Sequence, residues 1–223
     1  MNYYIILLIV IVLILLYFLY INYIASSTEI IPIVDLNKKR IDIAYKDLPK
    51  KDSSRYSYGL WIYVNSWTST NEKILMSRGE ATNPDFSLSL DRTSPILRCK
   101  IKPSTGTGTS ANIVITDNFP IQKWTYVVIS VDNQIIDLYL DGKLVLSKKI
   151  DFMPIVSTSD IYLGNDDKND IFLANVVRIP NPMDPQSVWN TYLSGNGQPN
   201  NSNVNLKLSV LQNNIEQKRF TLF

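Results

Sequence analysis

The sequence predicts an all-β antiparallel sandwich with one short helix, preceded by a single N-terminal transmembrane helix. Short segments of alternating apolar and polar residues recur from residue 55 onward, and that part carries only one helix signal. The chain also begins with a long uncharged apolar run. Such strands separated by turns are typical of sandwiches. We therefore divide the chain into an anchor (1–24), a stalk with a first strand (25–50) and a sandwich with a closing C-terminal hairpin (51–223).

The composition excludes several classes of function. The net charge is only +2, and no basic, aromatic-interleaved stripe predicts a nucleic-acid partner. The chain has no His, which excludes His-dependent catalytic dyads and imidazole metal ligands. The single Cys99 cannot form an internal disulfide, and its strand-like surroundings predict a buried, unreactive thiol. The lack of internal disulfides suits a reducing compartment.

The apolar N-terminal run extends from Tyr3 to Ile24 and carries no charge. A helix of this length would measure roughly 33 Å, enough to cross a hydrocarbon core. Tyrosines near both ends fit the aromatic belt of a membrane interface. The alternative, a cleaved signal peptide, is disfavoured because the run is too long and no Lys or Arg precedes it. The cations that follow, from Lys38 to Arg55, predict a single-pass membrane protein with its C-terminal domain on the cytoplasmic side.

The predicted strands follow one another from residue 56. The first runs to Trp67 and places one side chain in two on a shared face: Tyr58, Leu60, Ile62 and Val64. Further alternating segments follow around residues 72–80, 85–92, 96–102 and 112–116. Residues 124–150 then read as three strands joined by two turns. The Asp141-Gly142 turn is the strongest hairpin signal, since a type I′ turn requires positive φ at both positions.

The C-terminal part adds two strands, one helix and a hairpin. Residues 160–164 and 170–179 read as strands. The helix is predicted from Asp184 as N-cap and Pro185 at the first helical position, with Gly195 beyond its end. Residues 203–223 resemble a hairpin that turns at residues 212–214. We expect this hairpin to pair near the first strand and close the sheet.

These motifs resemble a known family in their order and spacing. The aromatic segment YGLWIYVNSW, the hairpin Tyr139-Leu140-Asp141-Gly142 and the later Leu163-Gly164 are similar to the concanavalin A-like lectin/glucanase superfamily, with the laminin-G-like or pentraxin-like branch closest. The resemblance covers about residues 53–195 and implies a jelly-roll sandwich. The combination of anchor, single domain and terminal hairpin also resembles membrane-anchored proteins of large DNA viruses.

The carboxylates do not match the catalytic pattern of the family. Its glucanases carry Glu-x-Asp-x-(x)-Glu on one strand, because paired carboxylates must share one face to cleave a glycosidic bond. None of the four glutamates of this chain lies in such a motif: Glu29, Glu72, Glu80 and Glu216. We therefore predict no catalytic residues and no enzyme activity.

Two places are candidates for ligand binding. The acidic loop at residues 164–170 offers the hard oxygen donors Asp166, Asp167, Asn169 and Asp170, and related domains often hold Ca²⁺ at this rim. Lys168 opposes this, so a solvated loop is the favoured interpretation, and no cofactor or resident metal is assigned. Trp67, at the end of its strand, is the best candidate to stack on a sugar, although core packing is the more common role of a Trp.

The predicted function is that of a non-enzymatic, membrane-anchored structural or interaction protein. In the viral context it would be a minor virion component that links the inner membrane to the capsid through its lectin-like sandwich. Its partners would be the membrane and proteins of the same particle or membrane. The alternative is a membrane-displayed lectin that binds glycans during attachment.

Overall fold

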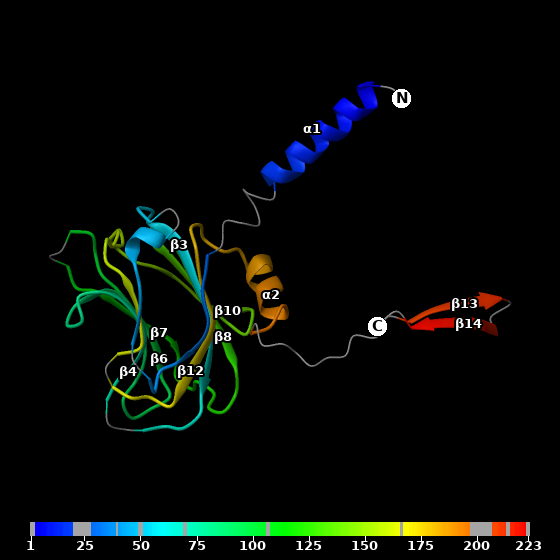
Figure 1. Ribbon diagram of the computed structural model, residues 1–223. Helices are drawn as coiled ribbons and strands as arrows, with labels where there is room; N and C mark the ends of the chain where they lie inside the picture. The colour runs from blue at the N-terminus through cyan, green and yellow to red at the C-terminus, as the bar shows by residue number, and fades with distance from the viewer. Residues whose placement is uncertain are drawn as a thin grey trace.

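Two six-stranded antiparallel sheets form the body of the protein (Figure 1). The computed structural model describes residues 3–19, 28–38, 40–48, 51–68, 71–105, 108–165, 167–196, 207–212 and 215–221. Sheet A has the order β1-β12-β3-β8-β9-β10, and sheet B has the order β2-β11-β4-β5-β6-β7. The predicted antiparallel sandwich with one short helix in its sandwich part is confirmed.

The strands of sheet A are six to ten residues long, and all but the Lys-rich edge strand at residues 143–149 are mainly apolar. Their bounds are β1 Thr28–Asp35, β12 Ile171–Ile179, β3 Arg55–Val64, β8 Thr125–Asp132, β9 Ile135–Leu140 and β10 Lys143–Lys149. The strands of sheet B are shorter. Their bounds are β2 Ile41–Ile43, β11 Ile161–Leu163, β4 Lys73–Gly79, β5 Pro84–Leu90, β6 Leu97–Ile101 and β7 Ala111–Thr116.

The main core lies between the two sheets because alternate residues of each strand point inward. On β3 the buried positions include Tyr58, Leu60, Ile62 and Val64, as the alternation predicts. On β6 the same face carries Cys99, which is fully buried. Burial raises the pKa of its thiol far above the ordinary value. The predicted buried thiol is therefore confirmed.

The hairpins of residues 125–149 have the predicted turns. Strands β8 and β9 are joined by a tight turn in which Asn133 has a φ of 56°. Strands β9 and β10 are joined by Asp141 and Gly142, whose φ values are 46° and 79°. Both residues of the second turn therefore have the positive φ that a type I′ turn demands.

Helix α2, Pro185–Leu193, packs on the outer face of sheet A. The Asp184 side chain caps it by accepting hydrogen bonds from the backbone N–H groups of Gln186 and Ser187, at 3.0 and 3.1 Å. A second apolar cluster lies here, with members on the strands and around the helix: Trp61, Tyr126, Val128, Tyr139, Ala174, Met183 and Val188. The N-cap predicted from the sequence is confirmed.

The N-terminal boundary of the sandwich differs from the prediction. Residues 28–35, predicted as part of a stalk, form β1 and pair with β12 at the edge of sheet A. Strand β2, at residues 41–43, pairs with β11 in sheet B. Pro32 is tolerated in β1 because an edge strand needs hydrogen bonds on only one side. The sandwich therefore begins well before residue 51.

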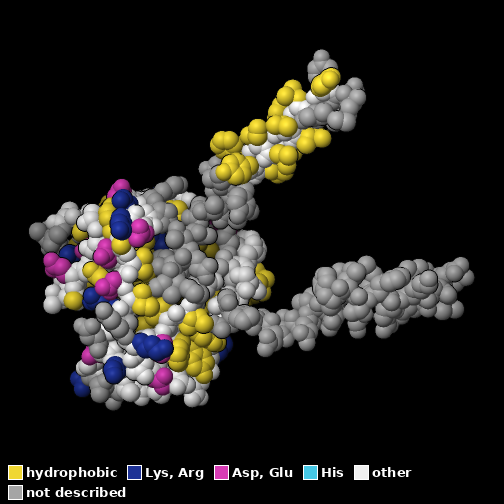
Figure 2. All heavy atoms as spheres, viewed as in Figure 1, with side chains coloured by type: hydrophobic (Ala, Val, Ile, Leu, Met, Phe, Trp, Pro, Cys, Tyr) yellow, Lys and Arg dark blue, Asp and Glu magenta, His cyan; other side chains and the backbone are white. Residues whose placement is uncertain are grey.

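Helix α1, Tyr3–Leu19, is uncharged and its described side chains form a continuous exposed apolar surface (Figure 2). It has 17 residues, whereas the apolar run in the sequence continues to Ile24. None of the helices in the described ranges is long and apolar enough to cross a membrane. The predicted transmembrane helix over residues 1–24 is therefore not supported by the structure.

The C-terminal hairpin is present but does not close the sandwich. Strands β13, Lys207–Gln212, and β14, Ile215–Thr221, form a two-stranded sheet of their own. The prediction that this hairpin pairs near the first strand and closes the sheet is wrong, because among the described strands β13 and β14 pair only with each other. Both six-stranded sheets and every described core residue lie within residues 28–195. This part of the chain thus contains a complete sandwich.

Candidate ligand-binding groove

The outer face of sheet B carries polar side chains at the positions that alternate with the core. On β5, Phe86, Leu88 and Leu90 point inward, and the intervening Ser87 and Ser89 line the outer face. On β6 the same alternation places Arg98 and Lys100 on the outer face. The strand period of two therefore builds a polar surface directly behind the core.

This surface is hollowed into a groove with two adjoining parts. The larger part has a volume of about 630 Å³ and lies over β4, β5, β6 and β7. The smaller part, about 380 Å³, continues towards β11. Both parts are lined by the same four residues: Ile74, Ala81, Pro84 and Ser87. Ser87 is 6% exposed and lies where the two parts meet, so we call the whole feature the sheet B groove.

The larger part of the groove is lined by charged and hydroxyl groups. The Ser89 hydroxyl donates to the Glu72 carboxylate at 2.5 Å, and the Arg98 guanidinium lies 3.4 Å from the Asp91 carboxylate. A hydrogen bond from the Thr93 backbone N–H, followed by the charge of Arg98, lowers the pKa of the Asp91 carboxyl. Lys100 and Asn112 complete the lining towards β7. This surface offers many hydrogen-bond donors and acceptors.

The smaller part ends in a cation held against an aromatic ring. The Arg40 guanidinium carbon lies 4.5 Å from the centre of the Tyr162 ring, and its Nε donates to Asp42 at 2.9 Å. Both Arg40 and Tyr162 line the groove. These contacts fix the orientation of the guanidinium. This end of the groove therefore combines a flat aromatic ring with a positive charge.

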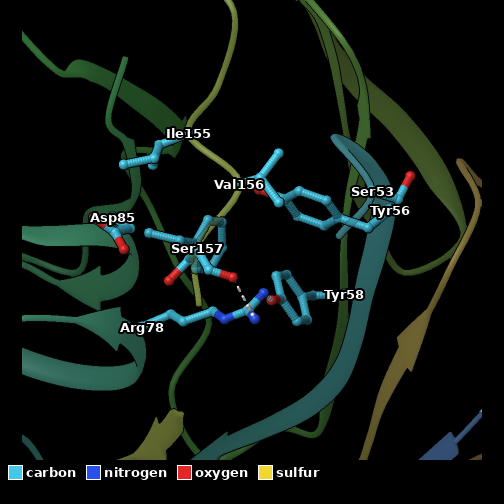
Figure 3. A pocket seen from close by; sticks show the side chains of 9 residues that line it. Ser53, Tyr56, Tyr58, Arg78, Asp85, Ile155, Val156 and Ser157 are labelled. Atoms are coloured by element: carbon cyan, nitrogen blue, oxygen red, sulfur yellow. Dashed lines mark hydrogen bonds between the residues drawn. The ribbon is translucent and has the colours of Figure 1, made fainter. Parts of the chain in front are cut away.

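A second, much smaller cavity lies where Arg78 enters the space between the sheets (Figure 3). The Arg78 guanidinium donates to the backbone carbonyls of Ser157 and Ser159 at 2.9 and 3.0 Å, and it lies beside the Tyr58 hydroxyl. Burial strongly raises the pKa of the neighbouring Tyr56. The cavity volume is about 10 Å³, which is room for about one water molecule. This cavity is thus too small for an organic ligand.

Three residues of the predicted acidic loop form hydrogen bonds within the protein. Asp170 accepts hydrogen bonds from Asn65 and Ser66 at 2.7 and 2.6 Å, and Asp167 accepts one from Asn165 at 2.9 Å. Asn169 is nearly buried and donates to the Asp167 carbonyl at 3.2 Å. Asp166 lies outside the described residues. Among the residues that are described, no cluster of three or more acidic or Cys side chains could hold a metal ion.

Trp67 is half-buried and packs against the main core. The ammonium group of Lys73 lies 4.2 Å from the centre of its ring. Lys73 is itself buried and donates to the backbone carbonyls of Asn71 and Arg92, at 3.3 and 3.2 Å. Burial lowers the pKa of this amine. One face of the Trp67 ring is therefore occupied by a cation, and its role in sugar binding stays a prediction.

The groove residues were not recognised in the sequence as a site. Their signal was present, because Ser87, Ser89, Arg98 and Lys100 are the polar members of two alternating strands. Alternation predicts which residues face outward, but it does not predict which strands are neighbours. The groove is assembled by the pairing of β4, β5, β6 and β7, and its residues come from separate parts of the chain.

Comparison with protein families gives one match over most of the chain. A family model described as the concanavalin A-like lectin/glucanases superfamily matches residues 37–204. This range includes both described sheets except β1. A comparison with curated proteins finds no match.

Solved structures with the same fold include binding domains of botulinum neurotoxins. The binding domain of neurotoxin DC in complex with rat synaptotagmin II has a TM-score of 0.51 at 17% identity, and the match covers 63% of this chain and 35% of that chain. The same domain in complex with SialylT has a TM-score of 0.52 at 17% identity, and the match covers 63% of this chain and 35% of that chain. The receptor-binding domain of the botulinum neurotoxin C/D mosaic serotype has a TM-score of 0.54 at 15% identity, and the match covers 65% of this chain and 37% of that chain. Each match thus spans little more than a third of the solved chain, and at these low identities the structural similarity shows a shared fold.

Proposed function

Because this chain belongs to the concanavalin A-like lectin/glucanase superfamily, we propose that it is a non-catalytic binding module that takes carbohydrate in the sheet B groove. Fold alone does not assign a function, so the proposal depends on the groove itself. Its two parts, of about 630 and 380 Å³, share lining residues and form one continuous hollow across the sheet.

The chemistry of the groove supports a polar, extended ligand. Ser87, Ser89 and Asn112 offer hydroxyl and amide groups that both donate and accept hydrogen bonds. Ile74 and Pro84 add apolar surface on the same floor, which suits the C–H faces of a sugar ring. Two adjoining parts fit more than one sugar unit. Carbohydrate therefore matches this combination better than a compact apolar ligand.

The neurotoxin domains support binding as the general role. They are solved in complex with synaptotagmin II, a protein, and with SialylT. Since the present chain covers about a third of those domains, their ligands are evidence for a class of function only.

A glycan-array screen of residues 25–223, with and without Ca²⁺, tests the proposal. The variant Ser87→Phe places a large side chain where the two parts of the groove meet. Ser147→Phe, on exposed β10, is the matched control. We expect binding by the wild type and by Ser147→Phe, and loss of binding by Ser87→Phe. A folded wild-type fragment that binds no glycan would contradict the proposal, and a requirement for Ca²⁺ would direct attention to Asp167, Asn169 and Asp170.

A second candidate function is the structural role predicted from the sequence. The uncharged, exposed surface of α1 favours attachment of the domain to a membrane or to an apolar partner. In that role the sandwich binds proteins of the same particle, and the chain links the inner membrane of a virion to its capsid, with the domain on the cytoplasmic side. Cross-linking of the full chain in its native membrane, followed by mass spectrometry, would identify such partners. If the cross-linked sandwich yields no neighbouring protein and is found attached only to the sugars of glycoproteins, this structural role is contradicted.

A further inference from the structure

Helix α2 and strand β10 together carry an exposed apolar surface on the outer side of sheet A. The two elements lie side by side (Figure 1). Four of their apolar side chains are 38% to 64% exposed: Trp189 and Leu193 on α2, and Leu144 and Val145 on β10. Leu144 pairs with Tyr139, a member of the apolar cluster at α2, so it lies on the helix side of the sheet. We call these four side chains the α2–β10 face.

The packing of α2 on the turn before β10 brings these side chains together. A Cβ on Gly142 would lie 2.7 Å from the Trp189 ring, so the ring abuts the turn that leads into Leu144. Leu193 follows Trp189 by four residues and therefore lies on the same side of the helix. A group of exposed apolar side chains of this kind is typical of an interaction surface.

Positive charge borders the α2–β10 face. Lys143, Lys148 and Lys149 of β10 are exposed, and within the described part of the chain none of them forms an ion pair. They outnumber the nearby acids that form no described ion pair, Asp137 and Asp151. Trp, Leu and Lys together are typical of protein surfaces that lie on an anionic bilayer, because the ring sits at the headgroups and the ammonium groups reach the lipid phosphates.

The same chain carries a helix whose surface favours lipid over water. Helix α1 is uncharged, and its described side chains are exposed and apolar. Residues 20–27 alone separate it from β1, and eight residues span at most about 28 Å. Strand β1 begins at Thr28, opposite Arg178 near the end of β12, and α2 starts soon after that strand. A bilayer that takes α1 therefore lies within reach of the α2–β10 face.

We propose that the α2–β10 face lies against the anionic surface of the lipid bilayer to which α1 attaches. This inference rests on the second candidate function, attachment through α1, and adds a contact that orients the sandwich. The lysines favour an anionic surface over an apolar protein, and a second copy would bring two sets of lysines together. Because the groove lies on the outer face of sheet B, this orientation points it away from the bilayer.

A fluorescent probe on α2 tests the orientation in the full chain. An environment-sensitive dye is attached to Leu193→Cys in a Cys99→Ala background, and the protein is reconstituted into vesicles of phosphatidylcholine and phosphatidylserine. The emission should shift to the blue and should be quenched by lipids that carry a quencher. The matched control is the same dye on Val114→Cys, on β7 of sheet B, where the side chain is 46% exposed and the emission should stay unchanged.

The contribution of the lysines is measured without α1. Residues 25–223 contain the complete sandwich, and they should sediment with phosphatidylserine-containing vesicles more than with phosphatidylcholine alone. Lys148→Gln and Lys149→Gln should each weaken binding to the anionic vesicles by about fivefold. The matched control is Lys168→Gln, an exposed lysine in the loop before β12, which should bind like the wild type.

The outcomes separate this inference from attachment through α1. If the full chain associates with vesicles but the dye on Leu193→Cys does not shift, the inference is overturned and attachment through α1 stands. A full chain that does not associate with vesicles contradicts both. A blue shift without vesicles that grows with protein concentration would place a second copy on this face. That result, or an equal response from the dye on Val114→Cys, would also overturn the inference.

Discussion

Arg78 illustrates how a single side chain holds a loop of this sandwich. Arg78 is 4% exposed, and its guanidinium donates to the carbonyls of Ser157 and Ser159 in the segment between β10 and β11. The hydrogen bond to Ser157 is buried and the one to Ser159 is partly buried, so both offset part of the cost of removing these carbonyls from water. The arginine therefore stabilises a connection that has few regular backbone hydrogen bonds of its own.

Arg78→Met should destabilise the domain by about 2 to 4 kcal/mol, because it removes the side-chain donor from one buried and one partly buried carbonyl. Arg55→Met is the matched control. Arg55 forms an exposed ion pair with Asp132 at 2.8 Å, so its loss should cost less than about 1 kcal/mol. Urea unfolding of both variants measures the difference. Equal midpoints for the two variants would show that Arg78 is not needed to hold the loop.

Gly142 combines a positive φ with close packing. A Cβ built on it would lie 2.7 Å from the Trp189 ring of α2, whereas one on Gly195 would contact nothing, although φ there is also positive at 82°. Gly195→Ala should therefore cost about 1 kcal/mol of backbone strain, and Gly142→Ala about 2 to 3 kcal/mol, because α2 must also move. Thermal unfolding compares the two, and a Gly195→Ala variant that is the less stable would refute this account.

Helix α2 depends on its N-cap. Asp184→Ala removes the acceptor of two backbone N–H groups and should cost about 1 kcal/mol. Hydrogen bonds from Ser187 and Gln186 lower the pKa of this carboxyl below its ordinary value of 3.8. Its contribution to stability is therefore complete above pH 3.8 and is lost as the pH falls through the lower, folded-state pKa.

The variant Asp184→Ser separates the cap from its charge. Serine keeps a capping oxygen, so the variant should be nearly as stable as the wild type near neutral pH and should lose less stability in acid. Urea unfolding between neutral pH and pH ~3 measures both proteins. Parallel losses in the wild type and the variant would show that Asp184 does not contribute to the acid sensitivity.

The positions of individual strands and of the helix were more predictable from the sequence than the pairing of the strands in the sheets. Local signals predicted β3, the β8–β9–β10 hairpins and α2, because alternation, the Asp141-Gly142 turn and the Asp184 cap depend on adjacent residues. Strand β1 was missed because an edge strand with Pro32 resembles a connector. Two features depend on contacts between segments that are distant in the chain: the pairing of β1 with β12 and the groove over β4 to β7. Patterns of adjacent residues in a single sequence do not predict such contacts.

At the scale of the whole molecule, Cys99 reports on the opening of the sandwich. Its thiol is fully buried between the sheets, and burial raises its pKa. Iodoacetamide should therefore modify it only when the domain unfolds, at a rate that rises with urea in parallel with unfolding. A double variant, Cys99→Ala with Ser147→Cys on exposed β10, should react at once without denaturant. Rapid alkylation of native Cys99 would contradict a tightly packed core.

The central claim is that the sheet B groove, rather than the rim of the sandwich, binds carbohydrate. Isothermal titration of the best oligosaccharide from the array into wild type, Ser87→Phe and Trp67→Ala tests it most directly, once circular dichroism has shown that each variant is folded. We predict that Ser87→Phe weakens binding by about tenfold or more and that Trp67→Ala retains the wild-type Kd. Wild-type affinity in Ser87→Phe together with loss of binding in Trp67→Ala would contradict the account and place the site at the rim.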